Sequence, residues 1–224
     1  MECNFTYNHF REAIGIAKDS GFSFFTMHDV LIKKPSGKII VLRHDVDLSM
    51  KHALKMAETE RMLGINSTYF FRVNEIVNPF SGKNSEMLRK IAKMGHEIGL
   101  HYDSDVISLD DFKEYLLDKK KKLEIASGSK VYGAALHRVK KLGAKNIETL
   151  NFIEGFLGEL GLEYDAYSEK FFKQLKYISD SARHWKEGCM CQHIGKWPRL
   201  YILTHPIWWS DTTTSLVSII EELI

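Results

Sequence analysis

The sequence predicts an α/β fold with a mainly parallel sheet, built as a single domain over residues 1–224. Short apolar runs typical of buried strands alternate with segments that have the apolar spacing of helices, and this alternation favours parallel strands joined by helices. Several of the apolar runs end in an aspartate or a histidine. In a parallel barrel the carboxyl ends of all strands open on one face, so these side chains would meet there.

The first half of the chain contains three segments of helical periodicity, and a glycine that would end the helix follows each one: Gly21, Gly64 and Gly95. Runs of aliphatic and aromatic residues lie between them and predict short strands. In chain order we expect a helix over 10–17, strands over 22–25 and 39–42, a helix over 50–63, a strand over 67–71, a helix over 87–94 and a strand over 98–100.

The second half continues the alternation with weaker signals. A lysine-rich amphipathic pattern predicts a helix over 112–125, whose lysines we expect on a solvated face. Gly155 and Gly158 weaken the helical pattern over 147–160, because glycine disfavours helix interiors. The remaining expected elements are strands over 131–136, 175–178 and 200–203 and a closing helix over 215–224.

Composition restricts the classes of function. The 224 residues carry a formal net charge of +2, which is too small to indicate binding to nucleic acid. No apolar run is long enough to span a bilayer and no signal-peptide pattern is visible, so we expect a cytoplasmic protein. The three cysteines are an odd number, which argues against a disulfide framework and fits a reducing compartment.

Cys189, Cys191 and His193 invite a zinc hypothesis. Their spacing lacks the two-residue gap of common zinc knuckles, and the only other cysteine, Cys3, is distant in sequence. We therefore interpret this group as structural or incidental.

The segment Arg43-His44-Asp45-Val46-Asp47 directly follows the expected strand over 39–42. Asp45 and Asp47 are two residues apart and would share one face of a strand, where two carboxylates repel unless a cation or a shared proton separates them. A metal ligand with a general base would explain the pair. Alternatively, Asp47 or Ser49 could cap the next helix. Capping explains one acidic residue only, so the segment favours a site.

Four further polar residues end predicted strands: His101, His137, Asp180 and His205. With Asp45 they give five strand ends that carry a group capable of metal ligation or proton transfer. In a parallel barrel these residues converge although they are far apart in sequence. This pattern predicts a catalytic site. His44 should point to the opposite face from Asp45, and His96 is expected at the surface.

Three segments resemble, in order, motifs of the polysaccharide deacetylase family (carbohydrate esterase family 4). They are most similar to the motifs of divergent family members whose first motif is Asp-x-Asp. The segments are Arg43-His44-Asp45-Val46-Asp47, Gly95-His96-Glu97-Ile98-Gly99-Leu100-His101 and Leu203-Thr204-His205-Pro206. The resemblance covers most of the chain. It implies a distorted (β/α) barrel, a divalent metal that is usually zinc, and hydrolysis of N-acetyl groups on amino sugars.

The resemblance also implies roles for matching positions. Asp45 would be the general base, Asp47 and His101 metal ligands, and His205 the general acid that protonates the leaving amine. The chain departs from the family in its second motif, where Asp105 stands at the position of a second histidine. His137 competes with Asp105 as the third ligand, and a carboxylate there would shift the preference toward harder metals.

Candidate substrate contacts are Arg43, Arg138, Asp180 and Trp208. Each has an alternative. Arg43 could pair with a carboxylate, Asp180 could orient His205 or Arg138, and Trp208 could pack in the core as most aromatic residues do. Arg138 lies in the region that corresponds to the family's arginine-proline motif, which is not plain in this chain.

The sequence thus predicts a metal-dependent hydrolase that removes an acyl group from the nitrogen of an amino sugar. A cytoplasmic location favours a nucleotide- or lipid-linked substrate in surface-polysaccharide synthesis over a finished polymer. Two alternatives stay open. The same metal barrel could hydrolyse another C–N bond or transfer an acyl group, or the barrel could bind saccharides without catalysis.

Overall fold

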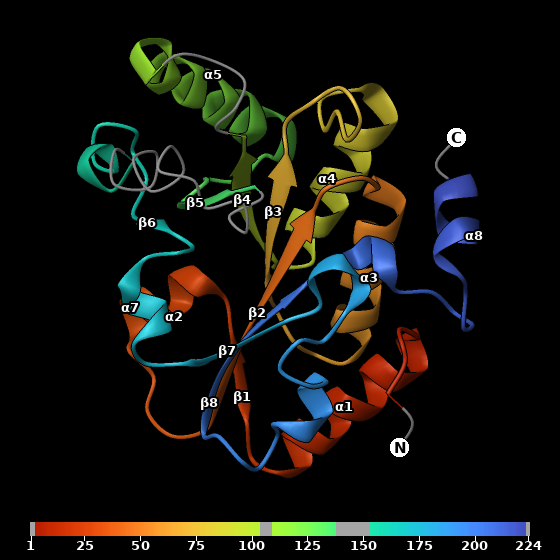
Figure 1. Ribbon diagram of the computed structural model, residues 1–224. Coiled ribbons are helices and arrows are strands. Elements are labelled where there is room, and N and C mark those ends of the chain that lie inside the picture. Colours follow the sequence, from red (N-terminus) through yellow and green to blue (C-terminus); the bar gives the residue numbers. More distant parts are fainter. Residues whose placement is uncertain (1–2, 104–108, 138–152, 223–224) are drawn as a thin grey trace.

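The computed structural model describes residues 3–103, 109–137 and 153–222 and shows one sheet surrounded by helices (Figure 1). Eight strands belong to this sheet. They are β1 (Ser23–Phe25), β2 (Ile39–Val46), β3 (Thr68–Arg72), β4 (Glu97–Tyr102), β5 (Gly133–Leu136), β6 (Tyr164–Asp165), β7 (Lys176–Ser179) and β8 (Arg199–Thr204).

All strand pairings of the described residues are parallel, in the order β6-β5-β4-β3-β2-β8-β7, and β1 pairs with β2 beside this path. The sheet curls into a half-barrel in which β2 pairs with three strands, β1, β3 and β8 (Figure 1). The first half of β2 lies between β1 and β8, and its second half lies between β3 and β8. The predicted α/β fold with a distorted, parallel barrel is confirmed.

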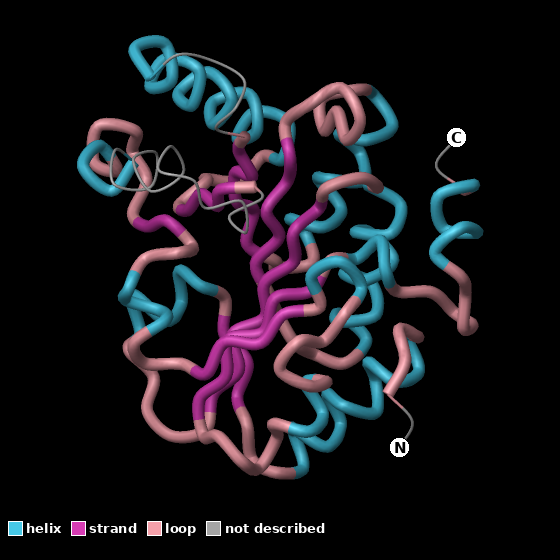
Figure 2. Tube along the Cα trace, in the orientation of Figure 1, coloured by secondary structure: helices cyan, strands magenta, loops and turns pink. Residues whose placement is uncertain are grey.

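Helices flank the sheet on both sides (Figure 2). They are α1 (Tyr7–Asp19), α2 (Met27–Lys33), α3 (Met50–Met62), α4 (Gly82–Lys93), α5 (Leu109–Ser127), α7 (Glu169–Phe172) and α8 (Leu216–Glu221), with 3-10 turns η1 (Ser181–Arg183), η2 (Met190–Gln192) and η3 (Pro206–Trp208). Ser49 caps α3 by accepting a hydrogen bond from the backbone N–H of His52, so the cap does not use Asp47. Among the described residues, no helix has the length and apolarity needed to cross a bilayer.

The expected elements match the structure with some corrections. Strand β2 does not end at Leu42 but continues to Val46, and every residue of it is buried. Charged residues can lie in this core strand because they are paired, which removes the cost of burying a lone charge. The short α2, β6 and α7 were not predicted. The helix expected over 147–160 lies mostly outside the described residues, and residues 153–156 are helical.

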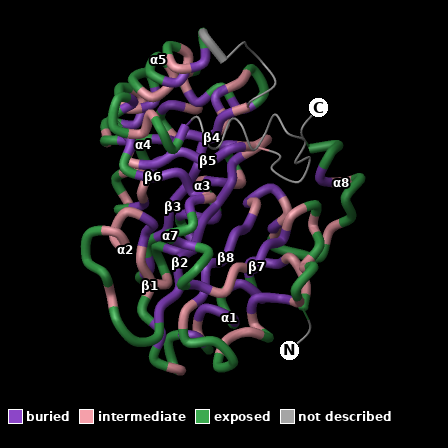
Figure 3. Tube along the Cα trace, turned by 60° about the vertical axis from the view of Figure 1, so that its left-hand side comes forward, coloured by how far each residue is buried: buried purple, intermediate pink, exposed green. Residues whose placement is uncertain are grey.

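The strands of the sheet are mostly buried (Figure 3), and the buried hydrophobic residues form two clusters. Ile40, Leu42 and Val46 of β2 belong to one cluster, whereas Ile39 and Val41 belong to the other, in the interior of the half-barrel. Because side chains alternate along a strand, the positions that continue the interior face are 43, 45 and 47. The sheet therefore directs the ionisable segment that follows Leu42 into the open end of the half-barrel.

Candidate metal centre and active site

The polar residues at the strand ends come together at the carboxyl edge of the sheet. Asp47 follows β2, His101 lies near the end of β4 and His137 follows β5. One ligand atom from each of these three side chains lies within 4.8 Å of the other two. We call Asp47, His101 and His137 the Asp47 group. The predicted convergence of distant strand ends is thus present in the structure.

Both histidines of the Asp47 group present the same ring atom to Asp47. Nε2 of His101 lies 3.1 Å from Asp47 Oδ1, and Nε2 of His137 lies 3.9 Å from the same oxygen. The Nδ1 atom of His101 donates to the backbone carbonyl of Ala135 at 2.8 Å, since a carbonyl can only accept. In the neutral imidazole, Nε2 therefore points a lone pair at a carboxylate oxygen.

Two features of this geometry fit a divalent cation. Asp47 Oδ1 is buried and makes no hydrogen bond, although the Asp47 side chain has an exposed fraction of 19%. A carboxylate oxygen faced by imidazole lone pairs is unfavourable without a positive charge between them. Two imidazoles and one carboxylate are also a donor set used by catalytic zinc, which keeps its fourth position open. The residues present therefore fit the metal that the sequence predicts.

The orientation of His137 depends on residues that the sequence did not reveal as site residues. Its Nδ1 donates to Asp103 Oδ1 at 2.6 Å, and Asp103 also accepts two hydrogen bonds from Arg72 at 2.9 Å. Arg72 ends β3, and Asp103 follows His101 by two positions. A carboxylate that fixes the tautomer of a ligating histidine is a common support of metal sites. Asp105, the competing third ligand, lies outside the described residues.

Asp45 is held by Arg43 on the same strand. The Arg43 Nε and Nη2 atoms donate to the two carboxylate oxygens of Asp45 at 2.7 and 2.8 Å. Burial alone would raise the pKa of Asp45, but the charge and hydrogen bonds of Arg43 outweigh burial and lower it, so Asp45 is ionised. His101 Nε2 lies 3.6 Å from Asp45 Oδ2, which places this carboxylate directly beside the Asp47 group.

Arg43 has an exposed fraction of 0% and also donates to the hydroxyl oxygens of Tyr201 and Tyr167. All of these partners belong to the protein. This placement favours the alternative that Arg43 pairs with a carboxylate over the predicted contact with substrate. The side chain positions Asp45 and compensates its charge inside the barrel.

His205 follows β8 and is oriented by Asp180, which follows β7. The His205 Nδ1 donates to Asp180 Oδ1 at 2.7 Å, and Nε2 lies 3.8 Å from Asp47 Oδ2. Burial opposes the charged imidazolium, but the hydrogen bond to Asp180 and the nearby carboxylates raise the pKa of His205 to about 9. His205 therefore carries a proton on Nε2 that faces the Asp47 group.

Asp180 is fully buried and also accepts a hydrogen bond from the Trp209 indole N–H at 3.1 Å. This arrangement supports the alternative that Asp180 orients His205, rather than a contact of Asp180 with substrate. Trp208 is half-buried beside His205, and its indole nitrogen is buried without a hydrogen-bond partner. This N–H is not accessible to a substrate acceptor, so a contact of the substrate with Trp208 would involve the ring and stays a prediction. Arg138 lies outside the described residues.

His44 and His96 both bind to a buried glutamate behind the site. As expected, His44 points away from Asp45, and its ring nitrogens contact Glu60 at 2.8 Å and Thr204 at 2.6 Å. The expected surface position of His96 is wrong, because this residue is buried and lies 3.6 Å from Glu60. Glu60 on α3 thus fastens the helix to β2 through His44 and to β3 through the Tyr69 hydroxyl, a role that needs three elements to be brought together.

No protein-family model and no curated protein matches the sequence. The structure, however, is similar to the catalytic domain of a peptidoglycan N-acetylglucosamine deacetylase from Eubacterium rectale, with a TM-score of 0.55 and 16% identity over 84% of this chain and 83% of that one. It is also similar to a Streptococcus pyogenes deacetylase solved in complex with acetate, with a TM-score of 0.55 and 12% identity over 79% and 74% of the two chains.

The chain has the fold of the family 4 carbohydrate esterases. This agrees with the resemblance of its three motifs to that family. A further similar structure is a family 4 pseudoenzyme from Bacillus anthracis, with a TM-score of 0.53 and 18% identity. The match covers 84% of this chain and 61% of the pseudoenzyme, so the chain spans about three fifths of that protein's length. At such identities the likeness is one of fold, and the activity has to be argued from the site.

Proposed function

We propose that this protein is a metal-dependent amide hydrolase that removes an acyl group, acetyl in the first instance, from the nitrogen of an amino sugar. The observation that carries the proposal is the position of Asp47 Oδ1, a buried oxygen without a hydrogen bond that the Nε2 atoms of His101 and His137 face. Asp45 and His205 flank this group with the protonation states that a base and an acid need.

The Asp47 group would hold the divalent metal, with zinc as the first candidate. Such a metal supplies Lewis-acid polarisation of the acyl carbonyl and a lower pKa for attacking water. Asp45 accepts the proton of that water as the C–O bond forms, and Arg43 keeps the carboxylate in place. General-base assistance requires that the attacking water lie beside both Asp45 and the residues that would hold the metal.

His205 supplies the proton for the leaving group. When the tetrahedral intermediate collapses, the C–N bond breaks and the amine nitrogen takes the proton from His205 Nε2. Asp180 holds the other ring nitrogen, so that Nε2 keeps facing the reacting centre. The half-buried ring of Trp208 lies beside His205 and would contact the substrate through its aromatic surface.

The substrate class rests on two supports. The deacetylase from Eubacterium rectale acts, by its name, on peptidoglycan N-acetylglucosamine, and the Streptococcus pyogenes deacetylase holds acetate. The three cysteines of this chain are all free, which suits a reducing compartment. We therefore propose a cytoplasmic enzyme whose substrate is a nucleotide- or lipid-linked N-acylated sugar of surface-polysaccharide synthesis.

The test is an assay of the zinc-loaded full chain for released acetate and free amine. The panel contains UDP-N-acetylglucosamine, short chitooligosaccharides and simple N-acetyl amides, and Asp45→Asn is assayed beside the wild type. The proposal is supported if the wild type releases acetate from an N-acetyl sugar and the Asp45→Asn variant does not. Turnover of other amides, without turnover of N-acetyl sugars, favours the alternative that the same centre hydrolyses another C–N bond or transfers an acyl group.

A non-catalytic, saccharide-binding barrel is the other candidate, and the similarity to a pseudoenzyme favours it. The two hypotheses differ in their dependence on the metal. Saccharide binding that survives both a chelator and the Asp45→Asn substitution, with no turnover on the panel, would replace the hydrolase proposal by a binding function.

A further inference from the structure

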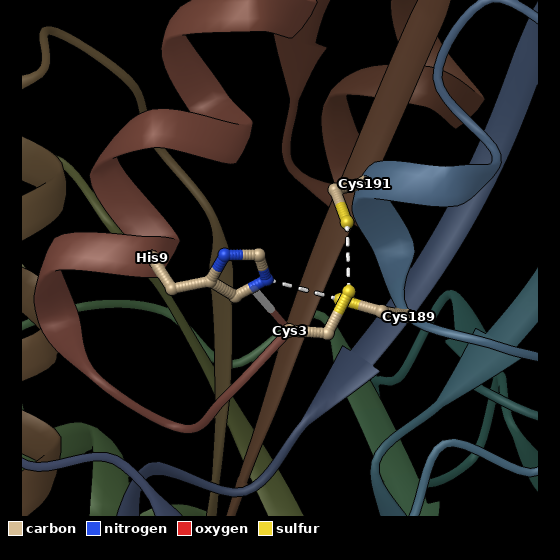
Figure 4. A group of neighbouring side chains, drawn as sticks. All are labelled: Cys3, His9, Cys189 and Cys191. Atoms are coloured by element: carbon tan, nitrogen blue, oxygen red, sulfur yellow. Dashed lines mark hydrogen bonds between the residues drawn. The ribbon is translucent and has the colours of Figure 1, made fainter. Parts of the chain in front are cut away.

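The N-terminal segment and the connection between β7 and β8 bring a second set of metal-ligating side chains together. Cys3, His9, Cys189 and Cys191 each offer a ligand atom, and these four atoms all lie within 4.8 Å of one another. Figure 4 shows the four side chains pointing toward a common centre. We call them the cysteine cluster. It contains all three cysteines of the chain.

Tertiary structure assembles this cluster from two distant parts of the sequence. Cys3 precedes α1 and His9 lies in its first turn, whereas Cys189 and Cys191 lie at the start of η2. The histidine of the cluster is thus not His193, whose Nε2 donates to the backbone carbonyl of Glu187. The view that Cys3 is too distant to take part is wrong, since its sulfur lies 3.4 Å from that of Cys191.

His9 needs a partner at this centre. Its side chain is buried, and within the described part of the chain its Nδ1 makes no hydrogen bond and its single polar contact runs from Nε2 to the Cys189 sulfur at 3.1 Å. A thiol sulfur is a weak hydrogen-bond acceptor, so it compensates poorly for removing an imidazole from water. A coordinate bond from Nε2 to a metal would compensate better.

The sulfur geometry also suits a metal. In a tetrahedral zinc site with Zn–S distances near 2.3 Å, neighbouring ligand sulfurs lie about 3.8 Å apart. The 3.4 Å between the Cys3 and Cys191 sulfurs is close to that value and far longer than the roughly 2.0 Å of a disulfide bond. Three thiolates and one imidazole form a complete tetrahedral set, which is the composition of structural zinc sites.

We propose that Cys3, His9, Cys189 and Cys191 bind a structural zinc ion. The proposal stands independently of the proposed function, because no residue of the cluster belongs to the Asp47 group. Thiolate ligands select soft or borderline metals such as zinc over magnesium or calcium. All four positions of a tetrahedral ion are filled by protein, so this ion has no open position for a substrate.

The zinc ion would fasten the N-terminal segment to the wall of the active site. Between Cys3 and His9, Phe5 packs edge-on against Trp209, and the backbone of this segment pairs with Ser210. Trp209 in turn donates to Asp180, the residue that orients His205. The cluster is therefore linked to His205 through Phe5, Trp209 and Asp180.

Metal content of the full chain tests the site. The protein is purified under reducing conditions with a tag free of histidine, loaded with Zn²⁺ and freed of excess. We expect about two zinc ions per chain, one lost in Cys3→Ser and in Cys191→Ser, and the other lost in His101→Ala. His193→Ala is the matched control and should keep both. Cys3 is exposed, so Cys3→Ser tests the site even if Cys191→Ser folds poorly.

Cobalt substitution identifies the ligands. His101→Ala protein loaded with Co²⁺ should show the thiolate-to-cobalt charge-transfer band in the near ultraviolet, and the band should vanish when Cys191→Ser is added. Unchanged zinc content in both cysteine variants, or no such band, overturns the proposal. A disulfide between Cys3 and Cys191, seen as a loss of two hydrogens in the intact mass of unreduced wild-type protein that binds no second zinc, overturns it as well.

Discussion

The Asp47 group and the cysteine cluster both gather ligands from distant parts of the chain, but they differ in chemistry and in accessibility. The Asp47 group has three ligand atoms, two of them imidazole nitrogens, and lies at the open end of the half-barrel beside an ionised base. The cysteine cluster has four ligand atoms, three of them sulfurs, and no acid or base of the proposed mechanism belongs to it. Three ligands leave a position for water and substrate, whereas four complete the coordination.

A reactive metal centre thus differs from a structural one in the number of its ligands and in the acids and bases beside them, rather than in metal affinity. In the Asp47 group, another residue holds the Nδ1 atom of each histidine. The Ala135 carbonyl accepts a hydrogen bond from His101, and Asp103 accepts one from His137. Asp45 and His205 lie beside this group and act as base and acid in the proposed mechanism. In the cysteine cluster the surrounding contacts join chain segments instead. If the comparison is correct, damage to one site should affect turnover and damage to the other should affect stability.

The largest effect is expected for Asp45→Asn. Loss of the general base should lower kcat about 10³-fold to 10⁴-fold, because an amide oxygen does not accept the proton of the attacking water. Zinc content should stay unchanged at both sites. Steady-state kinetics and metal analysis check this, with the exposed Asp19→Asn as control. Activity within tenfold of wild type would remove Asp45 from the mechanism.

Next in size is the effect of Cys191→Ser on stability. A metal bound only by the folded protein at about 1,000 times its Kd stabilises it by about 4 kcal/mol, which corresponds to roughly 10 °C in Tm for a chain of this length. Thermal unfolding with added zinc should show that loss. Wild type and variant should unfold at similar temperatures after complete chelation, since the metal alone causes the difference. A gap that persists without metal would point to lost packing of the side chain.

Asp180→Asn should lower kcat by about 10²-fold with little change in KM, because the amide no longer holds the His205 imidazolium in the orientation that delivers its proton. His205→Ala combined with Asp180→Asn should cost no more than His205→Ala alone, since both substitutions remove one function. Additive losses would show that Asp180 acts apart from His205, for instance on the substrate.

Asp103→Asn should weaken metal binding at the Asp47 group by about 10-fold to 100-fold, the usual cost of losing a residue that orients a ligating histidine. The cysteine cluster should keep its zinc. Competition titration with a coloured chelator measures both affinities. An unchanged affinity at the Asp47 group would indicate that His137 is not a ligand and would direct attention to Asp105.

The smallest effect is expected for Trp208→Leu, which removes the aromatic ring beside His205. A lost aromatic contact corresponds to about 1 kcal/mol, so KM should rise about fivefold while kcat holds. Trp197→Leu, the same change at an exposed tryptophan, is the control. An unaltered KM would leave Trp208 with a packing role only.

Residues at strand ends could be predicted because the parallel sheet gives them a common destination. Asp45, His101, His137, Asp180 and His205 each follow or end an apolar run, and the structure brings them to one edge. The partners of these residues could not be predicted in the same way. No sequence pattern links Arg72 and Asp103 to His137. The sequence around Arg43 likewise indicated neither the burial of this residue nor its tyrosine partners.

We could predict the alternation of strands and helices and the candidate acid, base and metal ligands from the sequence, because periodicity and strand position are local properties of the chain. Three contacts became evident only in the folded protein: His137 faces Asp47, Asp180 binds His205, and Cys3 and His9 meet Cys189 and Cys191. These contacts join residues across the whole chain, and their geometry depends on how layers pack. That packing follows from the burial of the complete core, which no single segment of sequence specifies.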